Sequence, residues 1–166
     1  MSKALEDLAA AFAGESQARN KYMAFAKKAE DEGYPQVARL FRAAAQAEYV
    51  HAQNHFRAMG EILSTGENLK AAIAGETYEV DSMYPPFIAD AQAEGNRKAE
   101  TTFKWAWEVE KTHAALYAEA LAALEKTRED DYDYYVCPVC GHTHKRGAPD
   151  KCPVCGTPGA RFERVH

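Results

Sequence analysis

The pair Glu48-x-x-His51 places a carboxylate and an imidazole where the apolar stripe of a helix would normally carry leucine. Residues three apart share one face of a helix. Apolar residues continue this face at steps of three and four, namely Val37, Phe41, Ala44, Met59 and Ile62. A second pair, Glu110-x-x-His113, lies in a similar stripe. The two pairs therefore predict two helices that bury polar ligands on the same face as their apolar residues.

A single glutamate precedes each pair at nearly the same distance along the chain. Glu15 precedes Glu48, and Glu76 precedes Glu110, with almost equal spacing. A helix with one glutamate is thus twice followed by a helix with Glu-x-x-His, which is the pattern of a pseudo-twofold four-helix bundle that binds two metal ions. Because an unpaired buried carboxylate costs several kcal/mol, we expect cations, and these donors suit iron or manganese. The expected ligands are Glu15, Glu48, His51, Glu76, Glu79, Glu110 and His113.

Four further residues allow more than one interpretation. Glu79 lies one helical turn after Glu76 and is either a ligand, a base behind the ligands, or a solvent-facing residue. His55 gives an H-x-x-x-H spacing with His51, but the intervening glutamate of zinc proteases is absent, so we expect a packing role. Tyr22 and Tyr84 are expected near the cluster, either as satisfied core residues or as hydrogen-bond donors to a metal-bound oxygen.

The helices are expected to form two successive hairpins. Apolar periodicity predicts the first helix over residues 2–31, and Pro35 starts the second after a glycine turn. The turn at residues 64–67 carries a capping-box pattern and is expected to open a longer connection. We place the third helix over residues 75–94 and end the fourth near residue 129. An acidic hinge at residues 129–133 then separates a bundle domain, 1–130, from a cysteine module, 131–166.

Composition argues against several classes of partner. With 20 basic and 25 acidic residues, the net charge is -5, and we expect neither nucleic acid nor anionic membrane as a partner. No apolar run approaches the roughly 20 residues that a membrane-spanning helix needs. Glu6 and Asp7 stand where a signal peptide would be basic, so we expect a cytoplasmic protein.

The four cysteines form a doubled motif. Cys137-Pro-Val-Cys140-Gly is repeated further along the chain as Cys152-Pro-Val-Cys155-Gly. Two such loops direct four thiolates at one ion, which selects zinc or iron. A zinc ribbon that only stabilises the tail would have the same spacing.

Taken in order, these motifs resemble the rubrerythrin family. They are Gly14-Glu15-Ser16, Glu48-x-x-His51, Gly75-Glu76-x-x-Glu79, Met83-Tyr84-Pro85, Glu110-x-x-His113 and the doubled C-P-V-C-G. The resemblance implies an all-α fold, a ferritin-like four-helix bundle followed by a small rubredoxin-like metal-binding domain. It also implies a homodimer in which the rubredoxin-like site of one chain lies near the di-iron site of its partner.

The resemblance further implies roles for individual residues. Glu48 and Glu110 would bridge two irons, Glu15 and Glu76 would each bind one, and His113 would stay on one iron. The other iron would exchange Glu79 for His51 on reduction, and Tyr22 and Tyr84 match family tyrosines, so Glu79, His51, Tyr22 and Tyr84 are the candidate catalytic residues. Residues 80–82 and Pro86 depart from the family pattern, which puts the local helix geometry in question.

The activity implied is a peroxidase that reduces hydrogen peroxide to water. Electrons would come from an external NAD(P)H-linked reductase and pass through one iron held by the four cysteines. A ferroxidase that uses dioxygen is the alternative enzyme, and a metal-stabilised bundle with a zinc ribbon is the non-enzymatic one. Zinc could occupy either site in recombinant protein made without enough iron.

Overall fold

The computed structural model describes residues 2–126 and 131–166 of the chain, and these group into two compact units that divide after Leu63. Most of the described residues are helical, and a small three-stranded sheet follows the last helix. The prediction of a mainly helical chain with a small C-terminal cysteine module is confirmed. Among the described residues, no helix is both long and apolar enough to cross a bilayer.

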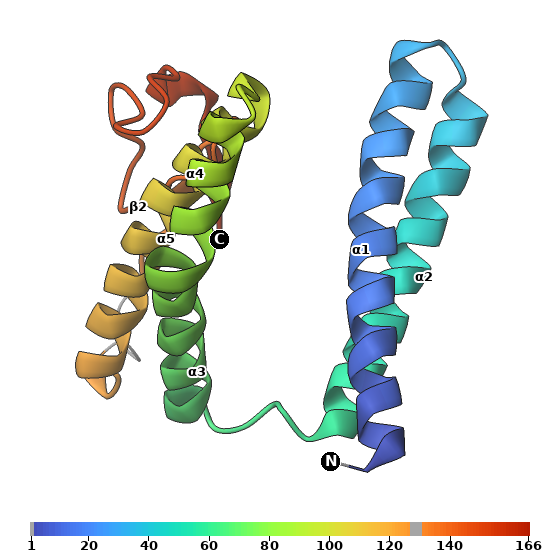
Figure 1. Ribbon diagram of the computed structural model, residues 1–166, viewed down its shortest axis with the longest axis horizontal. Helices are drawn as coiled ribbons and strands as arrows, with labels where there is room; N and C mark the ends of the chain where they lie inside the picture. The colour runs from blue at the N-terminus through green and yellow to red at the C-terminus, as the bar shows by residue number, and fades with distance from the viewer. Residues whose placement is uncertain (1, 127–130) are drawn as a thin grey trace. The chain divides into compact units, whose positions relative to one another are not determined.

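The first unit is a hairpin of α1 (Lys3–Asp31) and α2 (Pro35–Met59), which lie side by side (Figure 1). The hydroxyl of Ser2 caps α1 by accepting a hydrogen bond from the N–H of Leu5 at 3.4 Å. Gly33 has a φ of +81°, which allows the chain to reverse before Pro35 starts α2. The predicted hairpin is confirmed, and α1 begins one residue later than expected.

Small side chains form the interior of this hairpin. Its buried residues are Ala26, Ala29, Ala38, Ala45 and Ala52. Alanine lets two helices approach closely but removes little apolar area from water. Larger apolar side chains are left open, because Phe25 is 47% exposed, Val37 44% and Leu40 67%. The hairpin therefore leaves several large apolar side chains exposed outside its alanine seam.

The second unit begins with one helical stretch that runs from Thr65 to Ala93. It consists of α3 (Thr65–Tyr78), a π-helical segment η1 (Glu79–Met83) and α4 (Tyr84–Ala93). Ser64 caps α3 through a complete capping box: its hydroxyl accepts from the N–H of Glu67, and the Glu67 carboxylate accepts from the N–H of Ser64. The expectation of a longer connection up to residue 75 is wrong, because this box starts the helix ten residues earlier.

Helix α5 (Arg97–Ala122) follows after a tight turn and lies beside α3 and α4 (Figure 1). Asn96 caps α5 by accepting from the N–H of Ala99 at 3.1 Å. The fourth helix ends at Ala122, earlier than predicted, and residues 123–126 form turns. The predicted end at residue 129, and the first part of the acidic hinge, lie outside the described residues.

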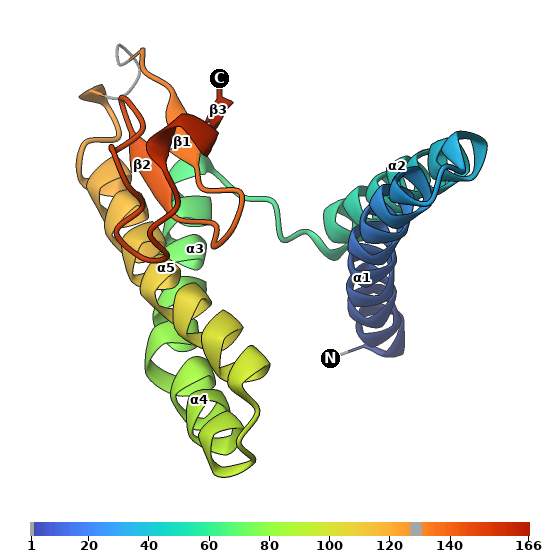
Figure 2. The same cartoon turned by 90° about the horizontal axis from the view of Figure 1, so that it is seen from above.

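The C-terminal module is an antiparallel sheet with strand order β2-β1-β3, formed by β1 (Tyr134–Val136), β2 (Thr143–Lys145) and β3 (Glu163–Val165). A short 3₁₀ turn, η3 (Gly159–Arg161), precedes β3. The carboxylate of Asp133 accepts a hydrogen bond from Arg164 at 2.7 Å and ties the two ends of the module together. Strand β2 contacts α5, and Figure 2 shows the sheet against that helix.

Candidate metal centres

The first cluster lies in the first unit and consists of Glu15 from α1 with Glu48 and His51 from α2. Its three ligand atoms lie within 4.8 Å of one another. Nδ1 of His51 is 2.9 Å from Oε2 of Glu48 and 3.8 Å from Oε1 of Glu15. The helical spacing of three residues thus brings the carboxylate and the imidazole together as predicted.

The second cluster lies in the second unit and consists of Glu76 from α3 with Glu110 and His113 from α5. Nδ1 of His113 is 2.8 Å from Oε2 of Glu110 and 3.7 Å from Oε1 of Glu76. These distances are nearly the same as the corresponding ones in the first cluster. The internal repeat seen in the sequence is therefore a repeat of three-dimensional geometry.

The electrostatics of the second cluster favour a bound cation. Burial and the nearby charge of Glu110 raise the pKa of Glu76 to about 7. Burial and the charge of Glu79 likewise raise the pKa of Glu110. Partly buried carboxylates that crowd one another are costly unless an opposite charge compensates them. Oxygen and imidazole donors in this arrangement fit iron, so the donor set suits the predicted cofactor.

Glu79 lies close enough for its charge to raise the pKa of Glu110. It is not one of the three residues whose ligand atoms meet in the second cluster. It is the first residue of the π-helical segment, in the region where the sequence had put the helix geometry in question. The indole N–H of Trp107 donates to the carbonyl of Val80 at 2.9 Å and satisfies one backbone group of this widened turn. No sequence pattern pointed to this hydrogen bond, because it joins residues that are distant along the chain.

The two candidate tyrosines have different surroundings. Burial, followed by the charges of Glu79, Glu110 and Glu76, raises the pKa of Tyr84, so its hydroxyl keeps its proton near the second cluster. Tyr22 belongs to an aromatic group in the first unit, with ring centroids 6.3 Å from Phe25 and 6.2 Å from Phe41. His55 is half-buried on α2 and is not part of the first cluster among the described residues.

The four cysteines meet as the doubled motif predicted. The Sγ atoms of Cys137 and Cys155 are 3.6 Å apart, and those of Cys140 and Cys152 are 3.5 Å apart. Tetrahedral ligation with metal–sulfur bonds of about 2.3 Å places sulfurs about 3.8 Å apart, so the thiols need little movement to bind an ion. Each loop turns at a glycine with positive φ, Gly141 at +83° and Gly156 at +77°.

The backbone favours the thiolate form of one cysteine, Cys137, whereas burial raises the pKa of the Cys140 thiol. Burial opposes ionisation of Cys137, but hydrogen bonds from the backbone N–H groups of Cys140 and Val139 prevail and lower the pKa of its thiol to about 6. A metal ligand must be a thiolate, so the backbone prepares this sulfur for a cation.

One contact joins the cysteine module to the second cluster. Nε2 of His113 lies 2.9 Å from the hydroxyl of Thr143 on β2. The Thr143 hydroxyl itself donates to the carbonyl of Gly141, the residue after Cys140, at 3.3 Å. Thr143 therefore accepts from Nε2–H of His113, and Nδ1 is the ring nitrogen that faces Glu110 and Glu76 in the cluster. No sequence pattern pointed to Thr143, because this contact joins residues that are distant along the chain.

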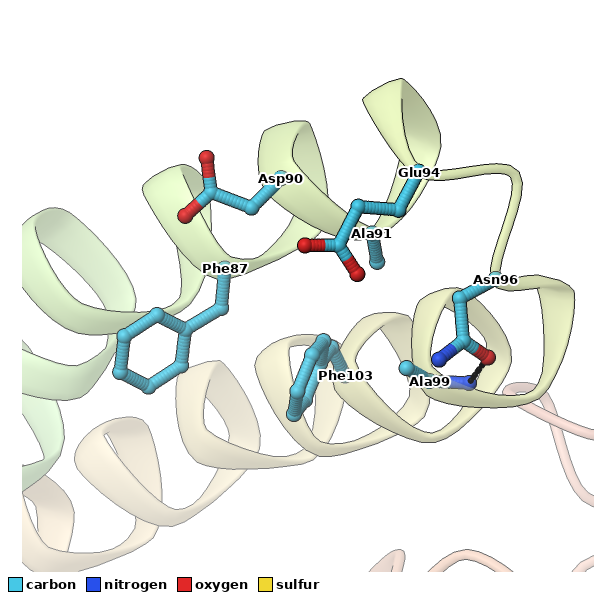
Figure 3. Close-up of a pocket in the computed structure, with 7 residues that line it drawn as sticks. All are labelled: Phe87, Asp90, Ala91, Glu94, Asn96, Ala99 and Phe103. Carbon is cyan, nitrogen blue, oxygen red and sulfur yellow. Dashed lines mark hydrogen bonds between the residues drawn. The ribbon is translucent and has the colours of Figure 1, made fainter.

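A separate hollow of about 380 Å³ lies where α4 turns into α5 (Figure 3). The rings of Phe87 and Phe103 form part of its wall with centroids 5.6 Å apart, and the carboxylates of Asp90 and Glu94 lie at its edge. None of the predicted ligands lines it. The hollow is thus distinct from the metal clusters.

Comparison with known proteins assigns both parts of the chain. A family model described as "Rubrerythrin" matches residues 6–121, and one described as "Rubrerythrin, rubredoxin-like domain" matches residues 135–163. Nigerythrin of Nitratidesulfovibrio vulgaris is 40% identical over 95% of this chain and 84% of that protein. Rubrerythrin-2 of Clostridium acetobutylicum is 36% identical over 94% of this chain and 93% of that protein. A solved structure of mixed-valence nigerythrin matches with a TM-score of 0.60 at 39% identity, covering 99% of this chain and 88% of that one.

Proposed function

Because the chain belongs to the rubrerythrin family, whose members are di-iron oxidoreductases, we propose that it is a peroxidase that reduces hydrogen peroxide to water. The reaction breaks the O–O bond and consumes two electrons and two protons for each peroxide. When bound in the ferrous state, two irons would supply both electrons. The first and second clusters together would provide six ligands for these ions, with Glu79 as a seventh.

The observation that carries the proposal is the hydrogen bond between His113 and Thr143. It connects a ligand of the second cluster to the cysteine module through Thr143 and Gly141, and Gly141 is covalently joined to Cys140. A one-electron centre in that module would therefore have a short bonded route to the site. Such a relay serves an enzyme that must be reduced again after every peroxide. A ferroxidase, which takes its electrons from its own ferrous substrate, has no need of one.

The remaining candidate residues would handle protons and exchange of ligands. Tyr84 keeps its phenolic proton beside Glu76, Glu79 and Glu110, so it would donate a hydrogen bond to a peroxide oxygen. Glu79 and His51 would alternate on one iron between the oxidised and reduced states. Tyr22 would line the site from the first unit. We further propose a homodimer that receives electrons from an external NAD(P)H-linked reductase.

The test is an anaerobic reoxidation experiment. The iron-loaded protein is fully reduced and then mixed with either hydrogen peroxide or dioxygen, while the absorbance of both iron centres is followed. We expect faster oxidation by peroxide, with the di-iron absorbance changing before the red colour of the ferric cysteine site returns. Faster oxidation by dioxygen would indicate a ferroxidase, and a colourless cysteine site would contradict the relay.

Substitution of Glu110 links this activity to the proposed ligands. Glu110→Ala removes a carboxylate from the second cluster, and we expect a loss of peroxidase turnover of at least about 100-fold. Glu108→Ala is the matched control, because Glu108 lies on the same helix but is paired with Lys111 at 2.7 Å at the surface. Full turnover in Glu110→Ala would refute the assignment of this site.

A further inference from the structure

We propose that two copies of this chain exchange their helical hairpins, so that each di-iron site combines the first cluster of one copy with the second cluster of the other. This inference rests on the proposed function, because it assumes that the two clusters act as one dinuclear site. It adds that a single chain cannot complete that site. Three features support it: the length of one connection, the position of the ligands in their helices, and the apolar surface of the hairpin.

A ferritin-like bundle contains one long crossover, which joins helices that run in the same direction. In this chain the connection between α1 and α2 is residues 32–34, and the connection between α4 and α5 is residues 94–96. Both are tight turns between antiparallel helices. The crossover would therefore have to be the connection between α2 and α3, which is residues 60–64.

This connection is too short for a crossover. Glu48 lies about three helical turns before the end of α2 at Met59, and Glu76 lies about three helical turns after the start of α3 at Thr65. At a rise of about 1.5 Å per residue, each ligand is about 16 Å from its end of the connection. If α2 and α3 ran in the same direction with these ligands at one level, the connection would have to span about 33 Å. Residues 60–64 and their flanking bonds reach about 21 Å when fully extended.

The cap of α3 prevents the chain from gaining length there. Ser64 and Glu67 form a complete capping box, so unwinding the first turn of α3 would break two hydrogen bonds. At the other end, Gly60 closes α2 with a φ of +75° and a hydrogen bond from its N–H to the carbonyl of Arg57. Both ends of the connection are therefore fixed by local interactions.

A second copy of the chain can provide the ligand cluster that the short connection keeps out of reach within one chain. The hairpin of the first unit exposes Phe25, Val37 and Leu40, and it carries only the first of the two ligand clusters. The second unit of another copy carries the complementary cluster with nearly the same internal distances. Exchange of identical elements preserves the fold of each bundle and yields a symmetric dimer. In that dimer the connection simply passes from one bundle to the other.

Mixed dimers provide the test. Full-length Glu48→Ala and Glu110→Ala chains carry different affinity tags, are co-expressed, and the mixed dimers are isolated through both tags. With exchange, one site of each mixed dimer receives both substitutions and the other receives neither. We expect about half of the wild-type di-iron content and di-iron absorbance, although neither parent forms an intact site. Glu48→Gln and Glu110→Gln, which preserve side-chain volume, serve the same purpose if an alanine variant folds poorly.

The control combines two lesions in the same cluster. In mixed dimers of Glu15→Ala and Glu48→Ala, exchange leaves one altered hairpin in every site, so no intact site should form. Absence of di-iron absorbance from the Glu48→Ala and Glu110→Ala dimers, with both cysteine sites coloured, would overturn the exchange. So would a wild-type monomer that holds two irons besides the cysteine-bound one. A wild-type protein without those two irons would instead refute the proposed function.

Discussion

At the level of single residues, Thr143 has the most specific task outside the ligands. It accepts a hydrogen bond from His113 and donates one to Gly141, so one hydroxyl both orients the imidazole ring and connects the second cluster to the cysteine module. A histidine ligand binds best when its second ring nitrogen is held by such a partner. The His113 imidazole is oriented by Thr143 of the cysteine module. Docking of the module and metal binding at α5 should therefore depend on each other.

Thr143→Val tests this role, because valine has the same shape but no hydroxyl. We expect the affinity of the di-iron site for ferrous iron to fall by about 10-fold or more, while the absorbance of the cysteine site stays unchanged. Anaerobic iron titration measures the first, and visible spectroscopy the second. Thr143→Ser should restore the affinity. Thr112→Val is the control, since the Thr112 hydroxyl bonds to the carbonyl of Glu108 within its own helix. Equal affinities in Thr143→Val and wild type would exclude a positioning role.

At the level of helices, the capping box at Ser64 decides where the second unit begins. It starts α3 ten residues before the position expected from apolar periodicity. It also leaves only residues 60–64 between the two units' helices. A local pair of side chains, Ser64 and Glu67, therefore sets the length on which the exchange of hairpins depends.

Ser64→Ala should weaken this helix start. Loss of an N-cap hydroxyl costs about 1 kcal/mol of unfolding free energy. Chemical denaturation of the iron-loaded chain, followed by circular dichroism, would show this as a lower midpoint. Thr77→Ala, which removes a hydroxyl from the exposed side of the same helix, is expected to change the unfolding free energy by less than about 0.5 kcal/mol. A Ser64→Ala midpoint equal to that of wild type would contradict the capping role.

The same helices show how far local sequence patterns reach. The two Glu-x-x-His pairs could be predicted because their spacing depends only on helix geometry, and both clusters form as that geometry requires. The start of α3 was missed because its first turns carry few apolar residues, although the capping box was visible. The sequence pattern placed the end of α5 too far along the chain, because no clear helix-stop signal follows Ala122. The contact of His113 with Thr143 depends on tertiary docking, which no local pattern encodes.

At the level of the whole molecule, the chain contains two similar helical pairs, each with one ligand cluster, and the cysteine module follows the second pair. Each cluster consists of two carboxylates and one imidazole, and the module is hydrogen-bonded to the second of them. If hairpins are exchanged, every di-iron site draws on two chains, but the cysteine module that touches it still belongs to the chain that provides His113. The expected proximity of a rubredoxin-like site to a di-iron site of the partner would then hold in part, because half of that site comes from the partner.

Lengthening the connection should reverse the exchange. We would insert about 12 glycine and serine residues after Gly60, which extends the reach well beyond the roughly 33 Å that a crossover needs. A single chain could then close its own site, because an intramolecular partner has a higher effective concentration than a second copy. In this lengthened background, Glu48→Ala and Glu110→Ala mixed dimers should no longer recover di-iron absorbance, whereas the lengthened chain without substitutions should bind iron normally. Undiminished recovery would mean that something other than the connection's length drives the exchange.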